Sequence, residues 1–266
     1  MQDIHTHLYW ESYDDDRDEV ILRARKVGVN QMIVVGTTLL ESEKALALAH
    51  AHDNVFAAAG IHPNEFRGEV GQYLTALEQM ASDEKVIAIG ECGLDYSLSH
   101  GGIDEATKAR QKRGFQEQLA LALKKALPVI VHCRDAYEDL LATLEEAQFA
   151  LPVILHCYMG DTEVTKKFLT LPQVYFSFTG NITYPVKKHL IGTQDDITET
   201  VKIIPKERIF VETDCPFLAP QSYRGKRNEP AYVIETARKV SDLLHMTDEE
   251  LDKQLEQNFQ TIFKIA

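Results

Sequence analysis

Seven residues able to bind a metal ion or transfer a proton lie in or just after short apolar segments of the sequence. They are His5, His7, His62, Glu91, His132, His156 and Asp214. Imidazoles and carboxylates suit borderline divalent ions such as zinc and manganese, and magnesium is possible when carboxylates and substrate oxygens complete its shell. Such ions polarise an ester and lower the pKa of a bound water. The residues therefore predict a metal-dependent hydrolase, provided that the fold brings them together.

The apolar segments alternate with segments of helical periodicity. Eight strands are predicted, at Asp3–His7, Gln31–Gly36, Val55–His62, Val86–Glu91, Pro128–Cys133, Pro152–Cys157, Val174–Gly180 and Arg208–Asp214. Helices are predicted at Arg17–Val27, Glu41–Ala51, Gly71–Ala81, Asp104–Ala126, Ala136–Glu146, Asp161–Leu169, Glu229–Leu244 and Thr247–Ile265. The nearly continuous apolar strands are typical of a parallel sheet buried on both faces. We predict an α/β fold, a single (β/α)8 TIM-type barrel domain over residues 1–266, with an open doubly wound sheet as the alternative.

The seven residues fall at or near the carboxyl ends of the predicted strands, which ring the active-site mouth of a (β/α)8 barrel. In an open sheet they would spread along one edge instead. His5 and His7 share one face of their strand, and Asp3 on that face is expected to orient an imidazole. If these groups had no function, burying them would cost several kcal/mol each unless every one were paired.

Two divalent ions about 4 Å apart need a bridging ligand, and the carboxylate of Glu91 can bridge them. One ion is expected to take His5, His7, Glu91 and Asp214, and the other Glu91, His132 and His156. The predicted cofactor is therefore a pair of divalent ions, zinc, manganese or magnesium. The cysteines Cys92, Cys133, Cys157 and Cys215 each follow a predicted ligand directly, so strand alternation turns them toward the helices. A register shifted by one residue would make the cysteines the ligands.

The composition limits the kinds of partner. The chain has 266 residues and a net charge of −13, so it cannot hold a long duplex through a broad basic face. Any contact with nucleic acid must be local. No apolar stretch approaches the roughly 18 residues of a membrane helix, and the first residues do not resemble a signal peptide. We expect a cytoplasmic protein with reduced cysteines, no membrane association and no obligatory protein partner.

Seven motifs together resemble the TatD-type deoxyribonucleases. They are DIHTH (3–7), GIHP (60–63), GECGLDY (90–96), VHCRDA (131–136), LHCYMG (155–160), ETDCPFLAP (212–220) and RGKRNEP (224–230). The resemblance implies an amidohydrolase-like barrel with divalent-metal-dependent 3′→5′ exonuclease activity on DNA. By resemblance the metal ligands are His5, His7, Glu91, His132, His156 and Asp214, and His62 belongs to the substrate pocket. Two departures are Leu8-Tyr9, where an Asp often comes second, and Met159, where a small Ser is more usual.

The expected reaction is hydrolysis of a phosphodiester at a 3′ end or in single-stranded DNA by an activated water. Asp214 is expected to act as ligand and general base and Glu91 as ligand, with His62 at the scissile phosphate or leaving oxygen. Arg134 is expected to clamp a phosphate, and Arg224 and Lys226, with Arg227, either hold the DNA backbone or are simply solvated. Tyr96, Tyr158 and Phe217 either stack on a base or pack. The remaining histidines, His50, His52, His100, His189 and His245, are expected at the surface.

Other functions use similar residues. A small-molecule amidohydrolase, such as a lactonase, phosphotriesterase or deaminase, is the main alternative, and an aminoacyl-tRNA deacylase is another. The phosphotriesterase type bridges its metals with a modified lysine on the fourth strand, where this chain has Glu91. A non-catalytic barrel that binds a partner is a third class, although such a scaffold need not keep all six ligands.

Overall fold

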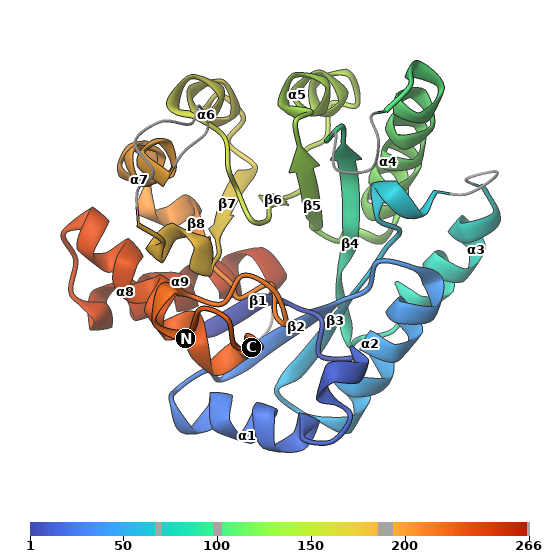
Figure 1. The fold of residues 1–266 in the computed structure, drawn as a ribbon. Helices are drawn as coiled ribbons and strands as arrows, with labels where there is room; N and C mark the ends of the chain where they lie inside the picture. Colours follow the sequence, from blue (N-terminus) through green and yellow to red (C-terminus); the bar gives the residue numbers. More distant parts are fainter. Residues whose placement is uncertain (67–70, 98–102, 186–193, 265–266) are drawn as a thin grey trace. The chain divides into compact units, whose positions relative to one another are not determined.

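The computed structural model describes residues 1–66, 71–97, 103–185 and 194–264 (Figure 1). Eight β-strands alternate with α-helices, and the strands form one parallel sheet in chain order, from β1 to β8. A further bridge joins Thr6 to Cys215, so the segment after the last strand pairs with the first strand. The predicted (β/α)8 fold is confirmed.

The strands are short and buried, which explains their continuous apolar sequences. They are β1 (Gln2–Thr6), β2 (Gln31–Val35), β3 (Val55–Ala59), β4 (Val86–Asp95), β5 (Val129–Arg134), β6 (Val153–Leu155), β7 (Val174–Phe178) and β8 (Ile209–Val211). The predicted carboxyl ends were wrong at several strands. His7, His62, His156 and Asp214 lie beyond the ends of their strands, whereas β4 continues past Glu91 to Asp95.

The helices are close to those predicted. They are α1 (Arg17–Lys26), α2 (Leu39–Ala51), α3 (Gly71–Met80), α4 (Glu105–Lys125), α5 (Tyr137–Glu146), α6 (Thr162–Leu169), α7 (Gln194–Ile203), α8 (Val233–Leu244) and α9 (Asp248–Phe263). Side chains of Thr38, Asp104, Asp161 and Thr247 accept backbone N–H bonds and cap α2, α4, α6 and α9. Helix α8 starts later than predicted because Pro230 begins a separate 3-10 turn. Helix α7 was not predicted.

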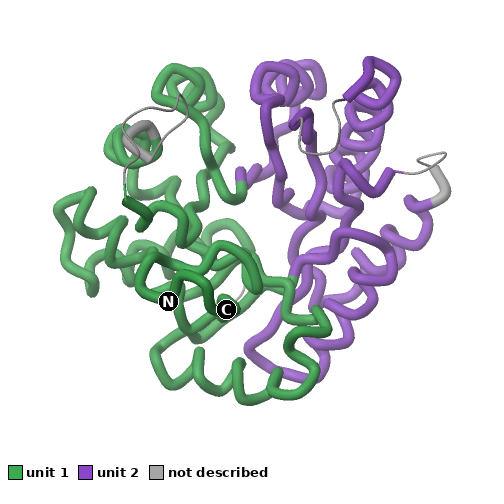
Figure 2. The backbone as a smooth tube through the Cα atoms, in the orientation of Figure 1, with its two compact units in different colours: residues 1–34, 156–266 green, residues 35–155 purple. Residues whose placement is uncertain are grey.

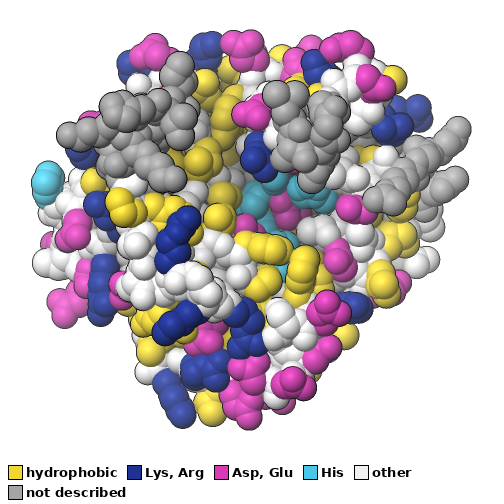
Figure 3. All heavy atoms as spheres, in the orientation of Figure 1, with side chains coloured by type: hydrophobic (Ala, Val, Ile, Leu, Met, Phe, Trp, Pro, Cys, Tyr) yellow, Lys and Arg dark blue, Asp and Glu magenta, His cyan; other side chains and the backbone are white. Residues whose placement is uncertain are grey.

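The chain forms two compact units, residues 1–34 with 156–266 and residues 35–155 (Figure 2). Unit 1 contains β1, β7, β8 and β2 up to Val34, and unit 2 contains Val35 and the strands β3 to β6. Each unit has its own apolar core, with Ile4 and Phe176 fully buried in unit 1 and Ile89 and Phe115 in unit 2. Lys and Arg side chains are interspersed with Asp and Glu on the face drawn in Figure 3, where histidines also reach the surface. Among the described residues, no helix is long and apolar enough to cross a membrane.

Candidate active site

Unit 1 brings together four of the predicted ligands, His5, His7, His156 and Asp214, which we call the first cluster. His7 Nε2 lies 3.3 Å from His5 Nε2 and 3.3 Å from Asp214 Oδ1. His5 Nε2 lies 3.8 Å from the same carboxylate oxygen, and the His156 ring stacks on the His5 ring at 4.0 Å. His5 is fully buried, and His7 and His156 are nearly so. Two imidazole nitrogens and one carboxylate oxygen therefore converge on one point.

These distances fit a divalent ion. With bonds of about 2.1 Å, neighbouring ligand atoms lie about 3.0 Å apart in an octahedral shell and about 3.4 Å apart in a tetrahedral one. The observed separations of 3.3 and 3.8 Å lie close to that range. Burial raises the pKa of Asp214, but the hydrogen bond with His7 and the neighbouring imidazoles outweigh it and hold that pKa below its ordinary value. The carboxylate is therefore already ionised, as a metal ligand must be.

Backbone hydrogen bonds between the ends of β1 and β8 hold the first cluster in place. The N–H of Asp214 donates to the carbonyl of His5, and the N–H of His7 donates to the carbonyl of Cys215, each at 2.9 Å. Asp214 has φ +55°, a left-handed conformation that Asp tolerates better than most residues. The chain is no longer extended at Asp214, which lies three residues after the end of β8.

Two buried carboxylates support the first cluster, and the sequence analysis missed one of them. Glu212 Oε1 accepts the N–H of Cys157 at 2.7 Å and lies 3.3 Å from His156 Nδ1. Asp3 accepts the backbone N–H of Thr213 at 2.9 Å, and its other carboxyl oxygen is hydrogen-bonded to the Thr213 hydroxyl at 2.6 Å. Burial raises the pKa of Asp3 to about 8. Glu212 precedes Asp214 by two residues, and this spacing is the feature of the sequence that could have identified it.

Unit 2 brings together Glu91, His62 and His132 with Asp95, and we call these four the second cluster. His132 lies between two carboxylates, with Nδ1 3.0 Å from Glu91 and Nε2 3.4 Å from Asp95. His62 Nε2 lies 3.6 Å from Glu91. One atom each of His62, Asp95 and His132 lie within 4.8 Å of one another, close enough to share an ion. Either carboxylate can accept the second N–H of the His132 ring, as such partners do in metal sites.

The sequence analysis also missed Asp95, which lies four residues after Glu91 on the same strand. It is nearly buried and held by donors from Asn64 and Ser97, each at 2.9 Å. Burial opposes its ionisation, but the bonds with His132 and Ser97 outweigh it and hold the pKa of Asp95 well below its ordinary value. Because β4 was predicted to end at Glu91, the acid inside the GECGLDY motif was not considered.

The other predicted contacts have different surroundings. Arg134 is exposed at the end of β5, two residues after His132. Arg224 lies over the Tyr184 ring at 4.2 Å, and Lys226 lies 5.7 Å from the centre of the Tyr223 ring. Arg227 is instead engaged within the fold, because both of its Nη atoms donate to Asp16.

The structure also shows where the other aromatic residues named in the sequence analysis lie. Of the two alternatives for Tyr158, stacking on a base or packing, the structure shows packing, since the ring is buried against Phe176 and Phe178. Tyr96 donates to Asp139.

His50 and His245 are exposed and His52 is half-buried, while His100 and His189 lie outside the described residues. Burial raises the pKa of the Cys157 and Cys215 thiols to about 12. No cysteine belongs to a metal-binding group within the described ranges, which supports the predicted register.

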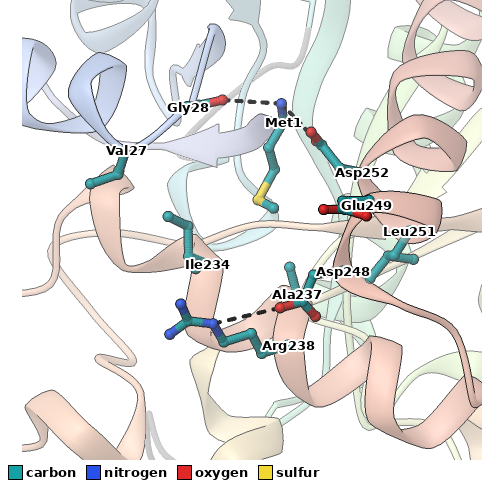
Figure 4. A pocket seen from close by; sticks show the side chains of 10 residues that line it. All are labelled: Met1, Val27, Gly28, Ile234, Ala237, Arg238, Asp248, Glu249, Leu251 and Asp252. Carbon is teal, nitrogen blue, oxygen red and sulfur yellow. Dashed lines mark hydrogen bonds and ion pairs between the residues drawn. The ribbon is translucent and has the colours of Figure 1, made fainter.

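A separate cavity of about 290 Å³ lies in unit 1, beside α8 and α9 (Figure 4). Its lining includes Met1, Val27, Arg238 and Asp252. Met1 precedes β1, whereas His7 follows it, so this cavity lies at the opposite end of the strand from the first cluster. It contains none of the predicted catalytic residues.

Comparison with known proteins gives matches along the whole chain. A model of the TatD-related DNase family matches residues 2–264. YabD of Bacillus subtilis (strain 168), named an uncharacterized metal-dependent hydrolase, is 39% identical over 99% of this chain and 98% of its own. The 3′-5′ ssDNA/RNA exonuclease TatD of Cronobacter sakazakii is 35% identical over 91% of this chain and 89% of its own. The solved structure of YJJV, a TatD homolog from Escherichia coli k12, has a TM-score of 0.89 at 26% identity, covering 100% of this chain and 98% of its own.

Proposed function

Because the chain belongs to the TatD-related DNase family and is a metal-dependent hydrolase, we propose that it removes nucleotides from the 3′ end of single-stranded DNA. The observation that carries this proposal is the first cluster, where three ligand atoms converge at the spacing of a divalent-metal shell. Several relatives of this chain are named 3′-5′ ssDNA/RNA exonucleases, which supports the substrate and the polarity.

We propose that each cluster holds a divalent ion, zinc, manganese or magnesium. His5, His7, His156 and Asp214 would hold one, and Glu91 and His132 the other. Such ions supply positive charge that polarises a phosphoryl oxygen and lowers the pKa of water. The carboxylate of Asp214 is ionised and accepts the proton of the attacking water.

Two side chains of unit 2 are proposed to bind the phosphate. His62 Nδ1 accepts the backbone N–H of Asn64 at 3.2 Å, so the neutral ring carries its proton on Nε2. That N–H is the donor for the scissile phosphate or for the leaving oxygen. Arg134 presents a planar guanidinium that can bind a phosphate through two hydrogen bonds. The exposed Arg224 and Lys226 are proposed to contact the DNA backbone farther along the strand.

The test is digestion of 5′-labelled single-stranded DNA with manganese, magnesium or zinc. The wild type is expected to shorten the strand from its 3′ end, and Glu91→Ala to lose at least about 100-fold in rate, more than loss of a supporting residue costs. Glu78→Ala is the matched control, because Glu78 pairs with Lys124 on the surface of the same unit. Absence of cleavage with every ion, together with turnover of lactones, phosphotriesters or aminoacyl-tRNA, would identify a different ester hydrolase.

A further inference from the structure

Two large aromatic side chains lie exposed beside the first cluster. Trp10 is 38% exposed and Phe217 is 43% exposed, and their rings meet edge to face with centroids 5.0 Å apart. The Phe217 ring centroid lies 6.4 Å from that of His7. Aromatic side chains of this size are normally among the largest contributors to a buried core. An exposed pair next to a metal-binding cluster therefore calls for a ligand with an apolar, planar surface.

The backbone fixes both rings relative to the predicted metal ligands. The N–H of Trp10 donates to the carbonyl of His7, and the N–H of Phe217 donates to the carbonyl of Asp214, each at 3.0 Å. Asn228 further holds the Phe217 carbonyl with a bond of 2.6 Å. Each aromatic residue thus closes a turn that begins at a predicted ligand, so the pair is positioned by the same turns as the cluster.

We propose that Trp10 and Phe217 form a stacking platform for a base of the single-stranded substrate. The inference rests on the proposed function and specifies how the polymer is bound. A base of a duplex already stacks on its neighbours, whereas a base of a single strand can present its face to an aromatic side chain. A small lactone or phosphotriester has no base to stack.

Net charge supports this mode of binding. The chain carries −13, so long-range electrostatics repel a polyanion rather than attract it. Stacking does not depend on charge and tolerates any base sequence, so it provides affinity where bulk attraction is lacking. The cations Arg224 and Lys226 lie in the loop after β8, close in sequence to Phe217, and are themselves placed on aromatic rings. They add local phosphate contacts without a broad basic surface.

The sequence contains a single tryptophan, so its fluorescence reports on the platform alone. Metal-free protein, kept inactive by a chelator, is titrated with a short oligothymidylate, an abasic oligonucleotide of equal length, and the corresponding duplex. The single strand is expected to quench Trp10 and to bind most tightly. Equal quenching and equal affinity for the abasic strand would overturn the proposal.

Phe217→Leu keeps apolar volume but removes the ring face, and Phe217→Ala removes both. Each is expected to weaken binding of the oligothymidylate by about 5- to 100-fold, the range measured when a stacking aromatic is truncated, and to leave affinity for the abasic strand unchanged. Leu22→Ala is the control, since Leu22 is a 49% exposed apolar residue on α1 of the same unit. With metal restored, the Phe217 variants should raise KM for the oligonucleotide far more than they lower kcat.

The two proposals fail separately. If Trp10 responds to single strands but no divalent ion supports cleavage, the proposed exonuclease activity is wrong and the platform remains. If the protein degrades DNA, but the Phe217 variants bind like the wild type and the abasic strand binds like the oligothymidylate, the platform is wrong and the activity remains.

Discussion

Replacement of Glu212 tests how His156 is held in the first cluster. The fully buried carboxylate accepts the N–H of Cys157 at 2.7 Å and lies 3.3 Å from His156 Nδ1. Glu212→Gln keeps an oxygen for Cys157 but removes the negative charge beside the imidazole. A hydrogen bond to a charged group contributes about 1.5–3 kcal/mol and a neutral one about 0.5–1.5. The difference of about 1–1.5 kcal/mol corresponds to a roughly tenfold loss of metal affinity, at the lower end of what supporting carboxylates contribute.

The assay is competition for zinc or manganese between the metal-free protein and a chelator, at acidic and at mildly alkaline pH. The carboxylate makes the His156 ring more basic, so the wild type must displace a proton at acidic pH to bind metal. In the glutamine variant the His156 ring is less basic, so fewer protons have to be displaced at the same acidic pH. We therefore expect the deficit of Glu212→Gln to be largest at alkaline pH and to shrink as the pH falls.

Glu229→Gln is the matched control. Glu229 is a nearly buried acid of the same unit that accepts two hydrogen bonds from Arg23, at 3.0 and 2.7 Å. Its replacement is expected to lower stability and to leave metal affinity unchanged. An unchanged affinity in Glu212→Gln, an equal loss in Glu229→Gln, or a deficit that does not vary with pH would refute the reasoning.

Three further predictions concern stability. In the folded protein the pKa of Asp3 is raised to about 8, so Asp3 keeps a proton that the unfolded chain releases near pH 4. The free energy of unfolding therefore falls as the pH rises between these two values. Asp3→Asn should flatten that fall in urea titrations of the metal-free protein. A Cβ at Gly93, where φ is +134°, would overlap the His132 carbonyl. Gly93→Ala should therefore lower the free energy of unfolding by about 3 kcal/mol and Tm by roughly 5–10 °C. Gly28→Ala is the control and should lower stability less, because a Cβ at Gly28, where φ is +93°, meets open space. A divalent ion at about 100 times its Kd should add about 2.7 kcal/mol of stability, and Asp214→Asn should abolish that gain in thermal melts.

The sequence was informative about the sheet because the strands are buried on both faces. Segments such as Gln31–Val35 are apolar at every position but the first, a pattern that a half-exposed strand or a surface helix does not give. The strand ends were less predictable, since no change in residue type marks the end of β8 at Val211, three residues before Asp214. Helix α7 escaped prediction because polar residues interrupt the segment before it.

Within the clusters, the predicted residues were those whose types alone suggest metal binding. Asp95 and Glu212 were missed because their importance depends on partners distant in sequence, His132 for the first and His156 for the second. Arg227 and Tyr158 show the opposite case. Their residue types suit nucleic-acid binding, but an acidic partner, Asp16, and a buried aromatic neighbourhood use them within the fold.

Of the two platform residues, the sequence analysis singled out Phe217 but not Trp10, and their place beside the first cluster is a property of the turns. Trp10 follows His7 by three residues and Phe217 follows Asp214 by three, and in both cases a backbone hydrogen bond closes the turn. Met159, which follows His156 by three, is 41% exposed. A substitution at such a position changes the surface beside the first cluster while the predicted ligand keeps its own backbone bonds. Substrate preference can therefore diverge at these positions between relatives that share the same ligands.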